Sequence, residues 1–297
     1  MDNVATLVSG ANGLDDTTIG TARNVLARHG VETGPVEWLA PDIACDIPFD
    51  GGAPYALQKA IRKDLGESLV DVVAQPRAER RKQLLVADMD STIITVECVD
   101  ELAAVVGCGE QVAAITARAM AGDIEFESAL KERVALLADT CVETLADVFE
   151  RKVELSPGAR TLVRTMSRHG AYTALISGGF RYFTERVGQR AGFDWNRGNV
   201  LEIVNGRLTG QLVPPILGRD EKRASLHRLA VDHNVPLTNT IAVGDGANDL
   251  DMIRNAGMGV AYRAKPIVAD CARARIEHAD LTALLYVQGY PRSSFVA

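Results

Sequence analysis

The amino-acid sequence predicts an α/β protein: a doubly wound parallel sheet with an inserted helical unit, preceded by a small α+β unit. Three observations predict this fold class. Short apolar runs at 84–87, 172–176 and 240–243 each end in glycine or polar residues, as buried strands of a parallel sheet do. The stretch from about 99 to 154 carries almost purely helical patterns, and the first 78 residues alternate strand and helix signals.

The first 78 residues are predicted to form a ferredoxin-like α+β unit. The order of its elements (strand, helix, strands, helix, strand) is that of a split β-α-β motif. The expected elements are a strand at 4–9, a helix capped at 15–17 and ended by Gly30, extended segments at 36–47, a helix at 57–65 and a strand at 69–74.

The next element is a buried strand at 84–87, which leads directly into two carboxylates, Asp88 and Asp90. Ligands of an open α/β sheet bind just beyond the carboxyl ends of the strands, so both side chains stand where a site belongs. An Asp pair that only ends a strand in a solvated turn would look the same. Taken alone, the Asp-Met-Asp-Ser-Thr stretch leaves these two interpretations equal.

Residues 98–154 are predicted to form four short helices between this strand and the remaining α/β units. Glycines at Gly107, Gly109 and Gly122 separate the apolar helical patterns. Such an insertion is typical of a cap domain that closes over a site and excludes water. The core of the protein would then consist of residues 79–97 and 155–297.

The α/β alternation resumes at residue 156. We expect Ser177-Gly178-Gly179 to follow a strand and to open the next helix. The expected elements are a helix from Ala159, a strand at 172–176, a helix through Phe183 and Val187, a hairpin turning at Asn205-Gly206, a helix at 219–229, a strand at 240–243, a helix at 250–255, a strand at 259–262 and a helix at 267–275.

Three of these strands end in polar clusters: Asp88 with Asp90, the segment 177–179, and the segment 245–249. Because the carboxyl ends of parallel strands meet at one edge of a sheet, we expect the clusters to converge. Lys222 lies in a predicted helix start between the last two. A lysine there is unfavourable to the helix dipole, which favours function over a solvated surface charge. Arg219 and Arg223 compete for the same role.

Composition narrows the function classes. The net charge of −7 argues against a general nucleic-acid or acidic-membrane partner. The five cysteines are scattered and lack a Cys-x-x-Cys pair, as expected for reduced thiols. The amino terminus shows no signal-peptide pattern, and no apolar stretch is long enough to span a bilayer. We therefore expect a cytoplasmic protein.

The ordered clusters from Leu84 to about Leu284 resemble the haloacid dehalogenase superfamily of phosphatases. The resemblance implies that Asp88 attacks phosphorus and forms an aspartyl-phosphate, while Asp90 protonates the leaving alcohol and then activates water. It also implies a Mg²⁺ ion bound by Asp88, Asp245 and the backbone carbonyl of Asp90. Asp-Glu-Lys-Arg-Ala-Ser-Leu resembles the family pattern that selects Lys222 as the cation for Asp88 and the phosphoryl group.

Three further residues of these clusters have expected roles. The Ser177 hydroxyl and the Gly178 backbone amide are placed to donate hydrogen bonds to phosphoryl oxygens, although a tight turn alone explains this pattern too. Asp249 is expected to orient a metal-bound water. Its alternative role is that of a helix N-cap.

The inserted helices carry a possible substrate site. Arg133 lies on an otherwise apolar helical stripe with Phe126 and Leu130. A buried cation needs a partner, and a substrate carboxylate is one candidate. The alternatives are an internal ion pair with Glu127 or Glu132, or a stem whose charged end reaches solvent. Glu97 is a candidate acceptor for a substrate ammonium, or else only a carboxylate at a helix start. Together these groups describe an amino-acid phosphate.

This arrangement is similar to the phosphoserine phosphatases, in which residues matching Glu97, Met120, Phe126 and Arg133 line the substrate pocket and Asn248 matches a residue that contacts phosphate or water. The resemblance implies hydrolysis of O-phospho-L-serine to L-serine and phosphate, the last step of L-serine biosynthesis. The alternative activity is hydrolysis of another small phosphomonoester, or phosphoryl transfer to an alcohol.

Residues 1–78 resemble a degenerate ACT-type module found in front of some bacterial phosphoserine phosphatases. The resemblance covers the order of elements only. It implies a homodimer contact or a stabilising unit, and alternatively a serine-responsive binding module that carries the main function.

Overall fold

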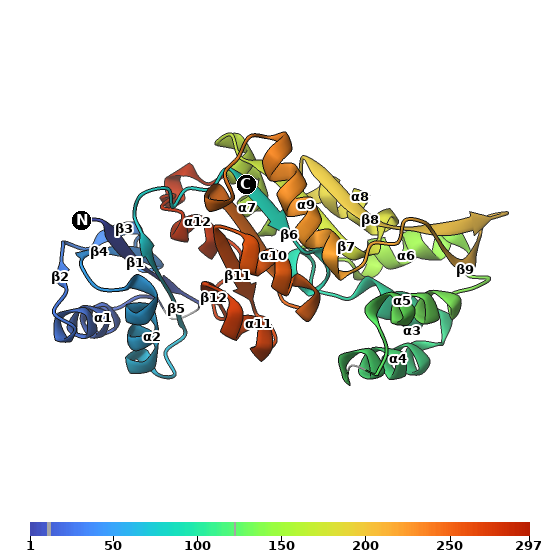
Figure 1. Ribbon diagram of the computed structural model, residues 1–297, viewed down its shortest axis with the longest axis horizontal. Helices are drawn as coiled ribbons and strands as arrows, with labels where there is room; N and C mark the ends of the chain where they lie inside the picture. The colour runs from blue at the N-terminus through green and yellow to red at the C-terminus, as the bar shows by residue number, and fades with distance from the viewer. Residues whose placement is uncertain (11–12, 122) are drawn as a thin grey trace.

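The computed structural model describes residues 1–10, 13–121 and 123–297, which form an elongated molecule (Figure 1). A small antiparallel sheet with two helices lies at one end of the long axis, and a large, mostly parallel sheet lies in the middle. A group of helices and a β-hairpin lie at the other end. The three parts follow the predicted fold class.

The small sheet has the strand order β2-β4-β1-β5, with β3 also paired to β4, and all its pairs are antiparallel. Asp15 caps the first helix by accepting a hydrogen bond of 2.7 Å from the Thr18 backbone N–H. Its elements are β1 (Asn3–Ser9), α1 (Asp16–Arg28), β2 (Glu32–Thr33), β3 (Glu37–Ala40), β4 (Ala44–Asp50), α2 (Pro54–Leu65) and β5 (Val70–Pro76).

The large sheet has the strand order β12-β11-β10-β6-β7-β8-β9, and only the β8–β9 pair is antiparallel. Its elements are β6 (Leu84–Ala87), α7 (Ala159–Arg168), β7 (Tyr172–Phe180), α8 (Arg181–Ala191), β8 (Trp195–Val204), β9 (Arg207–Val213), α9 (Arg219–Asp232), β10 (Thr240–Gly244), α10 (Leu250–Asn255), β11 (Met258–Tyr262), α11 (Pro266–Cys271), β12 (Ala274–Ile276) and α12 (Ala283–Val287).

Strand β6 shows why the sheet is doubly wound. Leu84 and Val86 pack with residues of α9, α10 and α11 on one face of the sheet. Leu85 and Ala87 pack with residues of α7, α8 and α12 on the other. All four side chains are fully buried, as their continuous apolar run predicted, because successive side chains of a strand point to opposite faces.

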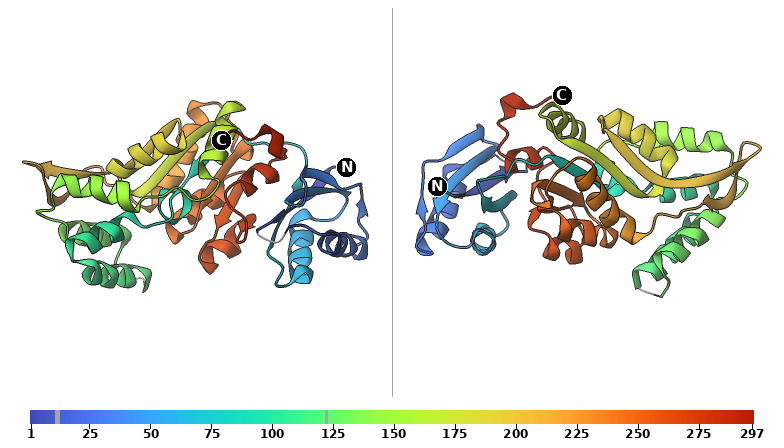
Figure 2. Two further views of the ribbon diagram at one scale, coloured as in Figure 1. Left: turned by 180° about the vertical axis from the view of Figure 1, so that it is seen from behind. Right: turned by 45° about the horizontal axis from the view of Figure 1, so that its top comes forward.

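The helical insertion, called the cap below, consists of α3 (Cys98–Val106), α4 (Gly109–Ala121), α5 (Phe126–Ala135) and α6 (Val142–Lys152). Backbone hydrogen bonds from Asp139 N–H to Leu208 O and from Val142 N–H to Gly206 O join it to the β8–β9 hairpin. Figure 2 shows this hairpin extending beyond the sheet beside the cap. Among the described helices, none has the length and apolarity needed to cross a membrane.

Two expectations for the core are wrong. The predicted helix at 267–275 ends at Cys271, and residues 274–276 instead form β12, which pairs in parallel with β11. The edge of β11 supplies main-chain hydrogen bonds that local helical spacing does not reveal. The segment 177–179 does not open a helix. It continues β7 to Phe180, with a register shift against β8, and α8 begins only at Arg181.

Candidate active site

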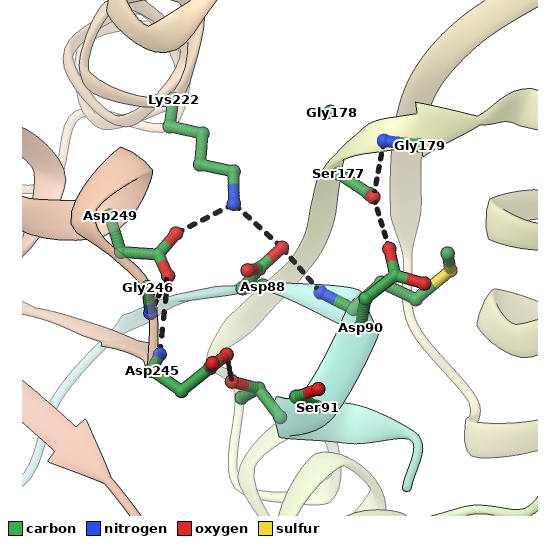
Figure 3. A network of polar contacts seen from close by, with 12 residues as sticks. Asp88, Asp90, Ser91, Ser177, Gly178, Gly179, Lys222, Asp245, Gly246 and Asp249 are labelled. Atoms are coloured by element: carbon green, nitrogen blue, oxygen red, sulfur yellow. Dashed lines mark hydrogen bonds and ion pairs between the residues drawn. The ribbon is translucent and has the colours of Figure 1, made fainter. Parts of the chain in front are cut away.

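The three polar clusters converge at the carboxyl ends of neighbouring strands (Figure 3). Asp88 follows β6, Asp245 follows β10, and Ser177 lies near the end of β7. Because β6 lies between β10 and β7 and pairs with both in parallel, these three side chains share one edge of the sheet. The predicted convergence is therefore what the structure shows.

Lys222 joins two of the carboxylates. Its Nζ lies 2.6 Å from Asp88 Oδ1 and 2.6 Å from Asp249 Oδ1, and all three side chains are buried. Burial alone lowers the pKa of this lysine, but the attraction of Asp249 and Asp88 outweighs burial, so the pKa is raised and the ammonium stays charged. Lys222 is the fourth residue of α9, which points the side chain from that helix into the site (Figure 3).

Asp249 is more than a helix N-cap. Its Oδ2 accepts hydrogen bonds from the backbone N–H groups of Asp245, at 3.2 Å, and Gly246, at 3.0 Å, while its Oδ1 pairs with Lys222. A Cβ added at Gly244 would lie 2.4 Å from the Asp249 carboxyl carbon. A residue without a side chain is therefore needed at the end of β10 for this carboxylate to fold back over the strand.

The acidic groups outnumber the cation. Oxygen atoms of Asp88, Asp245 and Asp249 all lie within 4.8 Å of one another, with Lys222 as their cationic neighbour. Burial, followed by repulsion from Asp249, raises the pKa of Asp88 and raises that of Asp245 to about 6. An excess of buried negative charge built from hard oxygen ligands fits a divalent cation such as Mg²⁺.

Asp90 faces a different part of the site. Its Oδ2 accepts a hydrogen bond of 2.8 Å from the Ser177 hydroxyl, and its Oδ1 accepts one of 2.9 Å from the Cys98 backbone N–H. The Ser177 hydroxyl in turn accepts from the Gly179 N–H at 2.8 Å. Figure 3 shows the Asp90 carboxylate turned toward β7 and away from Asp245. Two aspartates two residues apart thus have separate surroundings, which permits separate chemical roles.

The cap reaches this edge of the sheet through Phe126, the first residue of α5. A Cβ added at Gly178 would lie only 2.9 Å from the Phe126 ring. Glycine at this position therefore allows the cap and the end of β7 to approach each other closely. Gly178 is predicted to bind phosphate and Phe126 to bind the substrate, and the two residues lie within contact distance of each other.

Arg133 forms neither of the ion pairs considered for it. Glu127 pairs with Lys131 at 2.7 Å, and Glu132 pairs with Arg118 at 3.0 Å. The half-buried Arg133 donates from Nε to the Ala129 carbonyl at 3.3 Å, and no carboxylate of the described residues lies within ion-pair distance of it. Burial lowers the pKa of Arg133, while the charges of Asp100, Glu97 and Asp90 oppose that change. The guanidinium group is therefore close enough to these carboxylates to be attracted by their negative charge.

Glu97 lies at the start of α3, with part of the residue exposed to solvent. Its Oε1 accepts a hydrogen bond of 2.7 Å from the Ser91 hydroxyl. Desolvation of the carboxyl group and the charge of Asp90 raise the pKa of Glu97 to about 7. It is therefore a carboxylate at the site edge that titrates near neutrality.

Of the two remaining predicted residues, one can be placed against this network. Asn248 lies in the loop after β10, where its Oδ1 packs over Gly246, and it makes no hydrogen bond to another described residue. Met120 lies in α4, and its side chain is outside the described part of the chain.

Sequence reasoning missed two hydroxyl residues directly behind Asp90. Thr92 donates from Oγ1 to Asp245 Oδ1 at 2.9 Å, and Ser91 binds Glu97. Ser91 has φ of 54°, a left-handed conformation that is uncommon outside glycine. In the sequence, only their position next to the Asp pair marks these two residues. Local spacing does not reveal that Glu97 and Asp245 are their partners.

Comparison with known proteins gives a consistent picture. A family model for haloacid dehalogenase-like hydrolases matches residues 85–254. A phosphoserine phosphatase of Streptomyces coelicolor is 40% identical over 86% of this chain, which spans 63% of that protein's length. A phosphoserine phosphatase of Archaeoglobus fulgidus is 41% identical over 79% of this chain and 69% of its own.

A solved structure of a probable phosphoserine phosphatase from Vibrio cholerae superposes with a TM-score of 0.81. It is 32% identical, and the match covers 99% of this chain and 88% of that one. The similarity therefore includes the small antiparallel sheet as well as the large sheet and the cap.

Proposed function

Because this chain belongs to the haloacid dehalogenase-like hydrolases, we propose that it hydrolyses O-phospho-L-serine to L-serine and phosphate with Mg²⁺ as its cofactor. The observation that carries the choice of substrate is Arg133, a half-buried cation that lies in the field of Asp100, Glu97 and Asp90 and forms no ion pair with a carboxylate of the described residues. The names of the relatives support the same substrate.

Asp88, Asp245 and the backbone carbonyl of Asp90 would hold the metal ion, and Asp249 would orient a water bound to it. A bound Mg²⁺ would screen the charge of the phosphate and of the attacking carboxylate. Thr92 fixes one oxygen of Asp245, and the backbone amides at 245 and 246 fix Asp249. These contacts arrange the ligands before an ion binds.

In the first step, an Asp88 oxygen forms a bond to phosphorus while the bond from phosphorus to the seryl oxygen breaks. Asp90 gives its proton to that oxygen, so that serine leaves as a neutral alcohol. Lys222 offsets the negative charge of the carboxylate and the phosphoryl group. The Ser177 hydroxyl and the Gly178 N–H would bind phosphoryl oxygens.

In the second step, water attacks the phosphorus of the aspartyl-phosphate. Asp90 takes a proton from that water, the bond between phosphorus and Asp88 breaks, and phosphate leaves. Asp90 thereby returns to its protonated form, which balances the cycle. The hydrogen bond that it accepts from the Cys98 N–H keeps the carboxyl group aimed at the same place in both steps, including when the Ser177 hydroxyl donates to the phosphoryl group instead of to Asp90.

The cap would recognise the amino-acid part of the substrate. Arg133 would bind the carboxylate, Glu97 would bind the ammonium, and Phe126 and Met120 would line the apolar wall. Asn248 would contact the phosphate side. The predicted dimer contact and serine response of residues 1–78 are independent of this chemistry and stay predictions.

A phosphatase assay on related esters tests the substrate. We expect Mg²⁺-dependent phosphate release that is fastest for phosphoserine and slower for phosphothreonine, phosphoethanolamine and a nucleotide. Arg133→Ala should lower kcat/KM for phosphoserine by about 100-fold, the loss of a charged hydrogen-bonded pair, but leave phosphoethanolamine, which has no carboxylate, within about threefold. Lys131→Ala, on the exposed face of the same helix, is the matched control and should change neither. An equal loss on both esters would contradict the role of Arg133.

The pH dependence of the reaction tests Glu97. Because its pKa is about 7 in the free enzyme, the fraction that is ionised falls about tenfold between pH 8 and pH 6. Only the ionised form attracts an ammonium, so we expect kcat/KM for phosphoserine to fall by up to about tenfold over this range relative to phospholactate, which lacks the ammonium. Glu97→Gln should remove this difference between the two esters. If Glu97→Gln kept the wild-type difference in pH dependence between the two esters, Glu97 would not be the group that binds the ammonium.

A further inference from the structure

A cavity lies between the small antiparallel sheet and the large sheet, away from the candidate active site. It has a volume of about 500 Å³ and is lined by α2 on one side and by α11 and the segment around β12 on the other. In Figure 1, α2 and α11 stand on opposite sides of this junction, where β5 of the small sheet packs near β12 of the large one. A ligand in this cavity would touch both parts of the protein.

Four cationic side chains line the cavity: Lys59, Arg62 and Lys63 from α2, and Arg275 from β12. Arg62 and Lys63 come three and four residues after Lys59, so each is a neighbour of Lys59 on the surface of the helix. Lys63 makes no ion pair with any described carboxylate, and Lys59 contacts only the ring of Tyr55, at 4.6 Å. The cavity therefore concentrates positive charge in a protein whose net charge is −7.

Three carboxylates line the same cavity, and two of them are already engaged. Asp71 accepts hydrogen bonds from the backbone N–H groups of Glu277, His278 and Ala279, at 2.8, 3.1 and 2.8 Å. Glu277 is shared by Arg62 and Arg275. The third, Asp270, is exposed at the rim. Because the two guanidinium groups share one carboxylate, that of Glu277, some of their N–H donors remain for a ligand.

One of those donors is buried. Arg275 Nε is inaccessible to solvent and has no hydrogen-bond partner among the described residues. This N–H is closed to solvent, so an anion in the cavity would meet the exposed part of the Arg275 guanidinium group, whose side chain is 32% exposed. The guanidinium groups of Arg62 and Arg275 together present the planar donor arrangement that matches carboxylate and phosphate oxygens.

We propose that this cavity is a binding site for a small anion with at least two negative charges, built of carboxylate or phosphate groups, which joins α2 to β12. The Lys59 and Lys63 ammonium groups and the Arg62 and Arg275 guanidinium groups surround the anion. The site is independent of the phosphatase reaction, because none of its residues belongs to the candidate active site. Its occupant strengthens the attachment of the small sheet to the large one.

Thermal unfolding and calorimetry of the whole chain test the proposal, with citrate and inorganic phosphate as the two probes. Both titrations are run at constant ionic strength on protein freed of divalent ions with a chelating resin and with no soluble chelator present, so that the acidic cluster around Asp88 holds no divalent ion and repels anions. We expect one anion bound per chain and a Tm that rises by about 5 °C at about 100 times the Kd. Tighter binding of citrate than of phosphate would indicate a polycarboxylate ligand. Tighter binding of phosphate would indicate a phosphate ligand.

Charge-removing variants locate the binding. Lys59→Gln combined with Lys63→Gln should weaken the preferred anion at least tenfold, and Arg275→Gln should do the same, with phosphatase activity unchanged. Arg151→Gln combined with Arg168→Gln is the matched control, because it removes two exposed cations from the last turns of α6 and α7. Wild-type protein that binds neither probe, retained affinity in both cavity variants, or an equal loss in the control would each overturn the proposal.

Discussion

Asp88→Asn is expected to abolish turnover of phosphoserine, with kcat lowered by about 10⁴-fold or more, because the amide is no longer a nucleophile toward phosphorus. The shape of the side chain is kept, so the protein should still fold and Lys222 should still contact Asp249. The measurement is phosphate release, together with acid-quenched trapping of phosphorylated protein from phosphoserine with labelled phosphate. No phosphorylated protein should be recovered from the variant.

Asp220→Asn is the control for this experiment. Asp220 lies in the first turn of α9, with 85% of its side chain exposed, so its loss changes the net charge equally without entering the site. It should retain wild-type turnover and labelling. Turnover of Asp88→Asn within about tenfold of the wild type would rule out Asp88 as the nucleophile.

Lys222→Met is expected to have the largest effect on stability. The ammonium is the cation that Asp88 and Asp249 share at 2.6 Å, and both carboxylates are buried. Removing it leaves uncompensated buried charge, which destabilises a protein by about 3–5 kcal/mol. Urea unfolding in EDTA measures this difference in the free energy of unfolding. Phosphatase activity should fall at least about 10³-fold, because the charge that offsets the phosphoryl group is lost.

The pH dependence of that destabilisation has a definite sign. Burial already raises the pKa of Asp88, and loss of the neighbouring ammonium raises it further above that of the unfolded chain, so the folded state binds more protons. Stability is then greatest at low pH and is lost as the pH rises through the raised pKa. We expect the difference between wild type and Lys222→Met to be smaller at pH 5 than at pH 8.

Arg223→Met provides the control for the adjacent position of α9. Its side chain is half exposed and lies 3.7 Å from Asp220, a weak surface pair, so the free energy of unfolding should change by less than about 0.5 kcal/mol. If Lys222→Met were as stable as this control at pH 8, the buried charge cluster would not have the energetic role assigned to it.

Local patterns in the sequence were sufficient for much of the fold. The apolar run at 84–87 predicted a strand buried on both faces, and the Asn205-Gly206 pair predicted the turn between β8 and β9. The convergence of Asp88, Ser177 and Asp245 was also predictable. It follows from a general property of parallel sheets, whose strand ends share an edge, and requires no knowledge of side-chain contacts.

Other features depended on pairings between distant segments. The segment 274–276 has no strong strand pattern, and it is a strand because β11 offers it a free edge. That Arg133 pairs with no carboxylate in the described part of the chain emerged only from the structure, in which Glu127 and Glu132 have other partners. Periodicity places a residue on a face of a helix, but it does not state what lies opposite.

The sequence by itself determined the class of sheet, the inserted helices and the strand ends at which acidic, hydroxyl and glycine residues meet, because these follow from patterns within about ten residues. Only the tertiary structure decided that one lysine serves two buried aspartates, that Thr92 binds Asp245, and that four cations surround a cavity between α2 and β12. Each of these arrangements includes residues that are more than a hundred positions apart. Long-range packing sets their distances and their burial, and with them the charge that each group carries.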